Sequence, residues 1–255
     1  MVVSQKMRPN LDLLFFLSVS FFGLFLVGNL AFYPPGIQES FPWRKPAIGL
    51  IFGLICILGI LAVFSPRRCS RAFHQEKGEA NLRKIDRPEQ DKVGLQAASH
   101  IFKLRIVHGH HPGCENFSSH EFQVDKRSFC VSCMGLLFGA LITLAGTILY
   151  FFNEWPIATE GYLLIGVGIL GVALDLLRFL LFNVRRRVLR FSLNTFFVLG
   201  TFLILVQMDK LIQSLFIDLF LVLLSVFWLF TRIRLSQWDH EKICRACGLL
   251  CDFHR

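Results

Sequence analysis

The sequence predicts an all-α integral membrane protein, a six-span helical bundle with a small cytoplasmic Cys/His metal-binding module. The chain has 255 residues, is 54% hydrophobic and contains 28 Phe, and its mean hydropathy of +0.54 is too high for an ordinary soluble domain. Charged residues make up 18% of the chain and cluster, which leaves apolar blocks long enough to cross a bilayer. Two Cys-x-x-Cys pairs flank the last four of these blocks.

Each apolar block is about 20 residues long, which is the length that a helix rising about 1.5 Å per residue needs to cross the hydrocarbon core. In lipid, a single segment of this length satisfies its backbone hydrogen bonds only as a helix. The expected spans are Leu11–Tyr33, Pro46–Phe64, Val131–Phe152, Gly161–Phe182, Val188–Gln207 and Leu211–Thr231.

The spans divide the chain into four regions. We expect an N-terminal two-span hairpin (1–64), a cytoplasmic loop with a His/Cys cluster (65–129), a four-span membrane core (130–231) and a cytoplasmic Cys-rich tail (232–255). Near the end of the long loop, apolar residues flank a turn-like Asp125–Lys126 in the segment EFQVDKRSFC, which predicts a small β-hairpin.

The distribution of Lys and Arg predicts the orientation. One set of loops and the two termini carry 22 of the 27 basic residues, whereas the opposite loops carry only Arg44, Lys45 and Lys210. Because an excess of Lys and Arg marks cytoplasmic loops, both termini and the long loop are expected in the cytoplasm. The protein is therefore predicted to be integral to the cell membrane, with the lipid bilayer as its main partner and no nucleic acid expected.

The pairs Cys130/Cys133 and Cys244/Cys247 have the spacing of zinc knuckles, and a Gly follows shortly after each pair. The predicted topology brings both pairs to the cytoplasmic face, where thiols stay reduced and metal binding is favoured over a structural disulfide. Four thiolates would close a tetrahedron, which indicates a structural metal. The expected cofactor is zinc, with iron or an iron–sulfur cluster less favoured. The alternative is two unrelated pairs of thiols.

A second metal site is conceivable in the long loop, because imidazole and thiolate side chains suit zinc, iron or copper. The spacing fits no single template, and an exposed loop that binds nothing is the alternative. Its candidate ligands are His108, His110, His111, Cys114 and His120. Cys251 and His254 could replace a ligand in either site, while Cys56 and Cys69 are interpreted as bystanders.

Ionisable residues within spans are costly and mark either function or a buried pair. Asp175 and Arg178 are three residues apart on one expected helix and face one another, and Asn194 lies at a similar depth in the next span. We expect an intramembrane polar cluster of these three, with Arg178 extending towards the cytoplasm. Asp218 is expected to lie too far along the membrane normal to join them.

Two further patterns are interpreted as helix packing. Gly166 to Gly171 match the dinucleotide fingerprint, but they lie within an apolar span where small residues let helices approach closely. Gly135 and Gly139 give the same kind of small-residue face to the expected span Val131–Phe152. The chain has no phosphate loop and no H-E-x-x-H pair, so ATP hydrolysis and zinc peptidase activity are not supported.

The stretch HHPGCENFSSHEFQVDKRSFCVSCMGLLFGAL resembles the signature of an uncharacterised prokaryotic membrane family, domain of unknown function 2085. The resemblance runs from Val107 to Gly200 and departs from the pattern at Leu176, where the family usually has Gly, and in the spread of HHPGC. It implies a cytoplasm-facing cysteine site on a helical bundle and supplies no activity. The matching residues are Arg127, Ser128, Phe129, Cys130, Cys133, Gly135, Gly139, Asp175 and Asn194.

Together these features predict a scaffold or an accessory subunit of a membrane complex, with an enzymatic role disfavoured but open. One alternative is a thiol-redox protein that uses Cys130 and Cys133, since a helix N-terminus stabilises a thiolate. The other is a transporter of a small ion or metabolite. Its path would be lined by Asp175, Arg178, Asn194 and Asp218.

Overall fold

The structure, a computed structural model, describes residues 11–36, 39, 41–64, 98–101, 104–107, 121–124, 127–153, 155, 161–181 and 186–247. For 98–101, 104–107, 121–124, 127–129 and 244–247 it describes the backbone alone.

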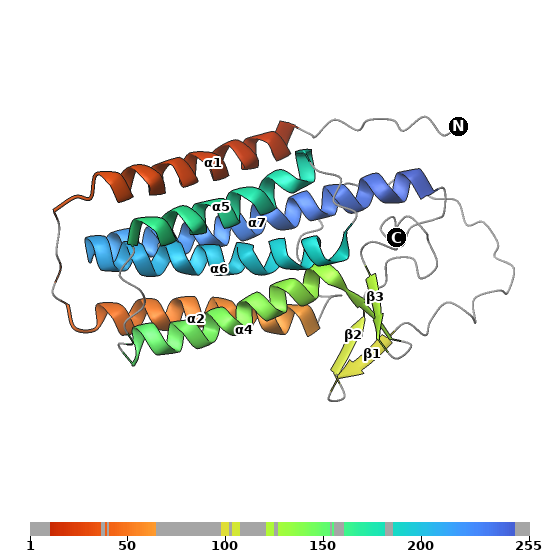
Figure 1. Cartoon of the computed structure of the whole chain (residues 1–255), viewed down its shortest axis with the longest axis horizontal. Helices are drawn as coiled ribbons and strands as arrows, with labels where there is room; N and C mark the ends of the chain where they lie inside the picture. The colour runs from red at the N-terminus through yellow and green to blue at the C-terminus, as the bar shows by residue number, and fades with distance from the viewer. Residues whose placement is uncertain are drawn as a thin grey trace, which may run out of the picture.

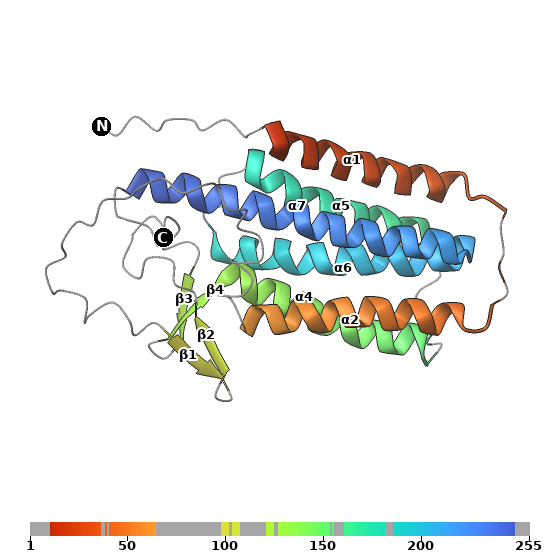
Figure 2. The same ribbon diagram turned by 180° about the vertical axis from the view of Figure 1, so that it is seen from behind.

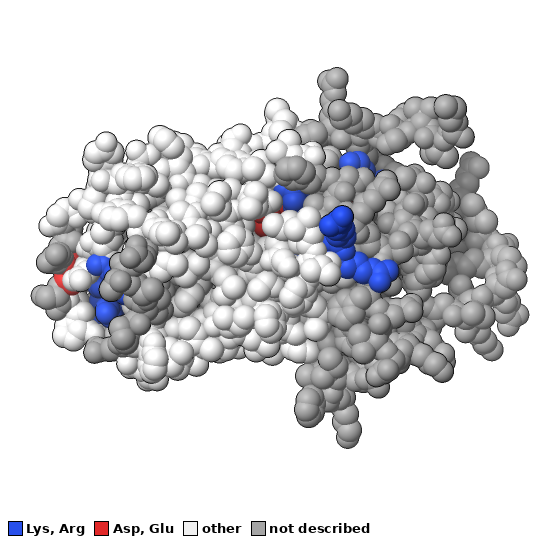
Figure 3. Space-filling model, viewed as in Figure 1, with Lys and Arg blue, Asp and Glu red and all other residues white. Residues whose placement is uncertain are grey.

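Six of the described helices are long and apolar enough to cross a membrane, which is consistent with a polytopic membrane protein. Many large apolar side chains point outwards along them, as lipid-facing side chains do. On the face shown in Figure 3, the described charged side chains lie in two groups, with an uncharged belt between them. The helices are α1 (Leu11–Phe32), α2 (Arg44–Phe64), α4 (Val131–Phe151), α5 (Gly161–Leu181), α6 (Arg187–Ile212) and α7 (Leu215–Cys247).

The helices run side by side, and α6 lies at the centre of the bundle (Figures 1 and 2). It packs against α4 and α5 along most of its length and also contacts α1 and α7. Helix α2 lies against α4 and α7, and α1 lies against α5 and α7. The bundle therefore has two ends. We call the end that bears the strands the hairpin end, and the opposite end, with the α6–α7 connection, the turn end.

Glycines allow the close approach of α6 to both neighbours. A Cβ atom on Gly135 of α4 would lie 2.5 Å from the Phe191 carbonyl oxygen, and one on Gly168 of α5 would lie 2.7 Å from the Gly200 carbonyl oxygen. Gly171 meets the backbone of α6 equally closely, whereas a Cβ on Gly166 would meet nothing within 4 Å. A Cβ on Gly139 would also lie 3.0 Å from the Thr195 carbonyl oxygen, so the expectation that these glycines serve helix packing is confirmed for Gly135, Gly139, Gly168 and Gly171 and not for Gly166.

The strands form two antiparallel hairpins beside the start of α4. In one, β1 (Ala98–Ile101) pairs with β2 (Leu104–Val107); in the other, β3 (Glu121–Val124) pairs with β4 (Arg127–Cys130). The second hairpin is the one that the sequence predicts around Asp125–Lys126, and it leads directly into α4. The first hairpin was not expected.

Several expected boundaries are corrected. Arg44 and Lys45 belong to the first turn of α2, and Asp209 and Lys210 lie within α6, so none of these is a loop residue. Helix α7 does not end at Thr231 but continues to Cys247, so residues 232–247 are helical and form no extended tail. At about 1.5 Å per residue its 33 residues span roughly 50 Å. This exceeds the hydrocarbon core, and α7 projects beyond the other helices at the hairpin end (Figures 1 and 2).

Candidate functional site

A buried ionic cluster joins α5, α6 and α7 in the half of the bundle near the hairpin end. Asp175 lies at its centre, fully buried, and pairs through Oδ1 with Arg178 Nε at 3.1 Å. Its Oδ2 accepts a hydrogen bond from Arg232 Nε, also at 3.1 Å. We call Asp175, Arg178, Asn194 and Arg232 the hairpin-end cluster. The expected grouping of Asp175, Arg178 and Asn194 is therefore found, and Arg232 is an addition to it.

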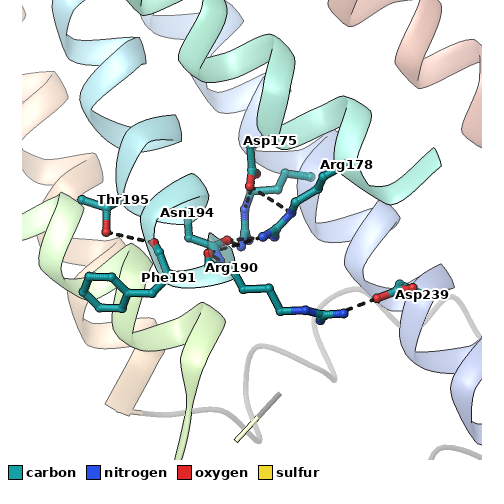
Figure 4. Close-up of polar contacts among 8 residues, drawn as sticks. Asp175, Arg178, Arg190, Phe191, Asn194, Thr195 and Asp239 are labelled. Atoms are coloured by element: carbon teal, nitrogen blue, oxygen red, sulfur yellow. Dashed lines mark hydrogen bonds and ion pairs between the residues drawn. The ribbon is translucent and has the colours of Figure 1, made fainter. Parts of the chain in front are cut away.

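Asn194 links the two guanidinium groups to α6 (Figure 4). Its Oδ1 accepts from Arg178 Nη2 at 3.0 Å and from Arg232 Nη2. Its Nδ2 donates to the carbonyl oxygen of Arg190 at 2.5 Å. A neutral amide suits this position because it offers an acceptor to both cations and a donor to its own helix. Gly135 lies against the Asn194 Cβ, so the α4–α6 glycine contact packs directly on the cluster.

The expectation that Arg178 extends out of the bundle is wrong. Its side chain is buried, with 5% exposure, and turns inwards to Asp175 and Asn194. The Asp175 carboxylate and the Asn194 amide oxygen replace part of the water that the buried guanidinium loses. The four described side chains carry two positive charges and one negative charge.

A second polar group lies nearer the hairpin end. Arg190 of α6 reaches towards Asp239 of α7, with Nη1 at 4.0 Å from Oδ2 (Figure 4). Arg190 also lies within electrostatic range of the Cys130 thiol. Cys130 is the N-cap residue of α4 and is buried, and Cys133 lies in the first turn of the helix and is half-buried. A helix N-terminus and a nearby guanidinium both stabilise a thiolate, which is the form that binds metal or attacks an electrophile.

The other predicted pair, Cys244 and Cys247, lies in the last turn of α7, and the side chains of both residues are outside the described part of the chain. Both pairs are thus carried by helix ends at the hairpin end of the bundle (Figures 1 and 2). The Gly that follows the first pair, Gly135, forms no turn around these cysteines, because it is helical and packs on α6. Among the described side chains, no group of three or more His, Cys, Asp or Glu is arranged to hold a metal.

The histidine-rich loop lies outside the described residues, so the second metal site stays a prediction. Its candidate ligands are His108, His110, His111, Cys114 and His120. The possible replacement ligands Cys251 and His254, and the expected bystander Cys69, also lie outside the described residues. Cys56 is described: it is buried in the hydrophobic core on α2.

At the turn end, a second buried ionic cluster joins α2, α4, α6 and α7. Arg44 Nη1 contacts Asp209 Oδ1 at 2.6 Å and also contacts Asp218 Oδ2. Tyr150 donates its hydroxyl to Asp209 Oδ2 at 2.5 Å. We call Arg44, Tyr150, Asp209 and Asp218 the turn-end cluster. As expected, Asp218 does not belong with Asp175, since it lies towards the opposite end of the bundle.

The backbone around the turn-end cluster is fixed by Glu39, in the connection between α1 and α2. The Glu39 carboxylate accepts from Ser214 Oγ at 3.0 Å and from the Leu215 backbone N–H at 2.9 Å. The Glu39 N–H donates to the carbonyl oxygen of Gln213, which has a left-handed conformation with φ of 50°. A carboxylate at the first N–H groups of α7 also suits the helix dipole.

Sequence reasoning missed Arg44, Tyr150, Asp209 and Arg232. Three of them carry charges within a few residues of an apolar block, where a charge is normally interpreted as a loop residue. The available signal was charge complementarity: Arg44, Asp209 and Asp218 are all expected near one membrane face, and they can neutralise each other if buried.

These features are consistent with a polytopic membrane protein whose interior is braced by an ionic cluster towards each end. No protein-family model, no curated protein and no solved structure matches the chain. The resemblance to domain of unknown function 2085 therefore stays a prediction.

Proposed function

We propose that this protein is a scaffold or accessory subunit of a membrane complex, and that a structural zinc ion bound by Cys130, Cys133, Cys244 and Cys247 holds its hairpin end. One observation carries the proposal: the start of α4 and the last turn of α7, which bear the two pairs, lie at the same end of the bundle (Figures 1 and 2). Pairs at opposite ends of the helices would have excluded a shared ion.

The residues suit such a centre. Cys130 and Cys133 are three residues apart at the N-terminus of α4, and Cys244 and Cys247 have the same spacing in the last turn of α7. Residues three apart on a helix share one face, which is the spacing that a pair of ligands to one ion needs. Four thiolates leave no position for water or substrate, so the ion would be structural. It would tie α4 to α7, and the positive charge of Arg190 near Cys130 would offset the thiolate charge.

A scaffold role is supported by the contacts that the buried arginines make between helices. In both clusters the arginines are engaged with side chains from other helices, through Asp175 and Asn194 at one end and Asp209 and Asp218 at the other. Such contacts brace helices against each other. The transport alternative stays a prediction.

The metal content of the full-length protein tests the proposal. Protein purified under reducing, metal-replete conditions should contain about one zinc per chain, as expected for a single four-thiolate site. The Cys130→Ser/Cys133→Ser variant and the Cys244→Ser/Cys247→Ser variant should each lose it. Cys56→Ser is the matched control and should keep it, because Cys56 lies in the apolar core of α2. Full zinc content in either double variant would contradict the proposal.

Thiol-redox chemistry is a second candidate, favoured by the position of Cys130 as N-cap of α4 beside Arg190. It predicts fast alkylation of Cys133 or Cys130 in metal-free and metal-loaded protein alike. The metal centre predicts slow alkylation that a chelator accelerates. The 8% exposure of Cys130 favours the second result.

A further inference from the structure

Two carboxyl groups in the turn-end cluster share one guanidinium nitrogen. Arg44 Nη1 contacts Asp209 Oδ1 at 2.6 Å and also Asp218 Oδ2. The three side chains are at most 4% exposed. A single guanidinium neutralises only one carboxylate, and an uncompensated charge buried in a low-dielectric interior is strongly unfavourable.

Among the described residues, three further charged side chains lie around the two carboxyl groups of Asp209 and Asp218. Lys45 of α2 and Lys210 of α6 hold their ammonium groups over the ring of Tyr150, at 5.3 Å and 5.9 Å from its centroid. Glu39 is engaged with the start of α7. Lys210 is exposed and Lys45 half-buried, so water or lipid headgroups screen both lysines more than they screen the buried pair.

The two carboxyl groups also lie close together, because one oxygen of each contacts the same nitrogen of Arg44. Asp218 Oδ1 and Asp209 Oδ1 are both buried and have no hydrogen-bond partner among the described residues. An ionised carboxylate is an acceptor only, so two of them cannot form a hydrogen bond without an added proton.

Tyr150 distinguishes the two carboxyl groups. Its hydroxyl donates to Asp209 Oδ2 at 2.5 Å. Arg44 Nη1 serves both groups, as an ion pair with Asp209 Oδ1 and as a hydrogen bond to Asp218 Oδ2, and Oδ1 of each group has no hydrogen-bond partner among the described residues. A donor stabilises the ionised form of a carboxyl group, so the Tyr150 hydroxyl favours placing a shared proton on Asp218.

We propose that Asp209 and Asp218 form a proton-binding site, in which the pair holds one exchangeable proton at neutral pH on Asp218, towards Asp209. Carboxyl groups held this close behave as a single coupled unit. Binding adds one proton from water to the doubly ionised pair, leaving the net charge of the turn-end cluster at zero, and release restores the buried negative charge. The proposal is independent of the metal centre at the other end of the bundle.

Carboxyl spectroscopy on the full-length protein tests the site. Protein with ¹³C-labelled Asp carboxyl groups, reconstituted in lipid, would be followed by infrared and NMR from neutral to alkaline pH. We expect a protonated Asp signal at neutral pH that disappears on alkaline titration. Asp218→Asn should abolish it. Asp12→Asn, the same change at an exposed position at the start of α1, should leave it intact.

Two results would overturn the assignment: wild-type protein with every Asp ionised at neutral pH, or folded Asp218→Asn protein that keeps the protonated signal. Tyr150→Phe provides a test that needs no change at either carboxyl group. Because it removes a donor to the ionised Asp209, the pair should hold its proton to higher pH. A titration that Tyr150→Phe leaves unmoved would equally contradict the site.

Discussion

At Asp175, one carboxylate receives a guanidinium from its own helix and another from α7. The arginines also converge on Asn194. Each group is buried, so each depends on the others to replace the water it loses. Removing the single carboxylate leaves two buried cations facing each other, which is far more costly than removing an exposed ion pair.

We therefore expect Asp175→Asn to destabilise the protein by about 3–5 kcal/mol, the usual cost of breaking a buried charge pair. Adding Arg232→Gln should recover part of this loss, because it removes one unpaired charge. Unfolding in detergent measures both effects, with Asp12→Asn as the exposed control. A change within about 0.5 kcal/mol, typical of surface positions, would show that the cluster is not a structural brace.

The sequence predicts part of this chemistry and misses part of it. Asp175 and Arg178 could be paired from their spacing alone, because residues three apart share a helix face. Arg232 and Arg44 could not, since each lies at the edge of an apolar block and charges there are normally solvated. Their burial depends on partners from other helices, and no local pattern reports such a contact.

Among the elements, α6 depends most on its glycine contacts. Gly168 and Gly200 place the backbones of α5 and α6 in direct contact, and Gly135 and Gly139 do the same for α4 and α6. In lipid, such close packing is a principal source of helix association. These contacts bring Asp175 and Asn194 within reach of one another.

Gly168→Ala should consequently destabilise the bundle by about 1–3 kcal/mol, because its Cβ would meet Gly200 O at 2.7 Å and overpack the interface. Gly166→Ala is the matched control on the same helix, with open space around its Cβ. It should be neutral or stabilising by up to about 1 kcal/mol, since Ala favours helix. Thermal unfolding distinguishes the two, and equal effects would contradict the packing role.

Element boundaries separate what local sequence determines from what it does not. The β3–β4 hairpin was predictable from its turn residues and flanking apolar positions. The β1–β2 hairpin was not, because Phe102 and Lys103 between its strands are not turn-forming residues. The extent of α7 was missed because Arg232 and Arg234 resemble a span terminus, although Arg is a good helix former once its charge is paired or solvated.

In the molecule as a whole, the two ionic clusters lie towards opposite ends and differ in formal charge. The hairpin-end cluster has two arginines and one aspartate, and the turn-end cluster has one arginine and two aspartates. Among the described residues, the hairpin end also carries Arg186 and Arg187 at the start of α6 and Arg234 on α7, and the turn end carries Lys45 and Lys210. The buried charges and the basic residues described at the helix ends are therefore both more positive at the hairpin end.

That asymmetry favours an orientation with the hairpin end in the cytoplasm. Reporter fusions check it: a fluorescent protein that matures only in the cytoplasm should fluoresce when fused at either terminus, because six crossings return the chain to its starting side. A phosphatase active only outside the cytoplasm should be active when fused after Gly36. The reverse pattern at all three sites would show that the bundle is inverted.

Helix α7 is continuous and contributes residues to both ionic clusters and to the second cysteine pair. Asp218 lies near the beginning of α7, Arg232 and Asp239 lie along it, and Cys244 and Cys247 lie in its last turn. An unbroken helix is stiff, so the side chains along α7 keep fixed separations along its axis. The two ionic clusters, which share no side chain, are therefore held at a constant distance from each other by this one helix.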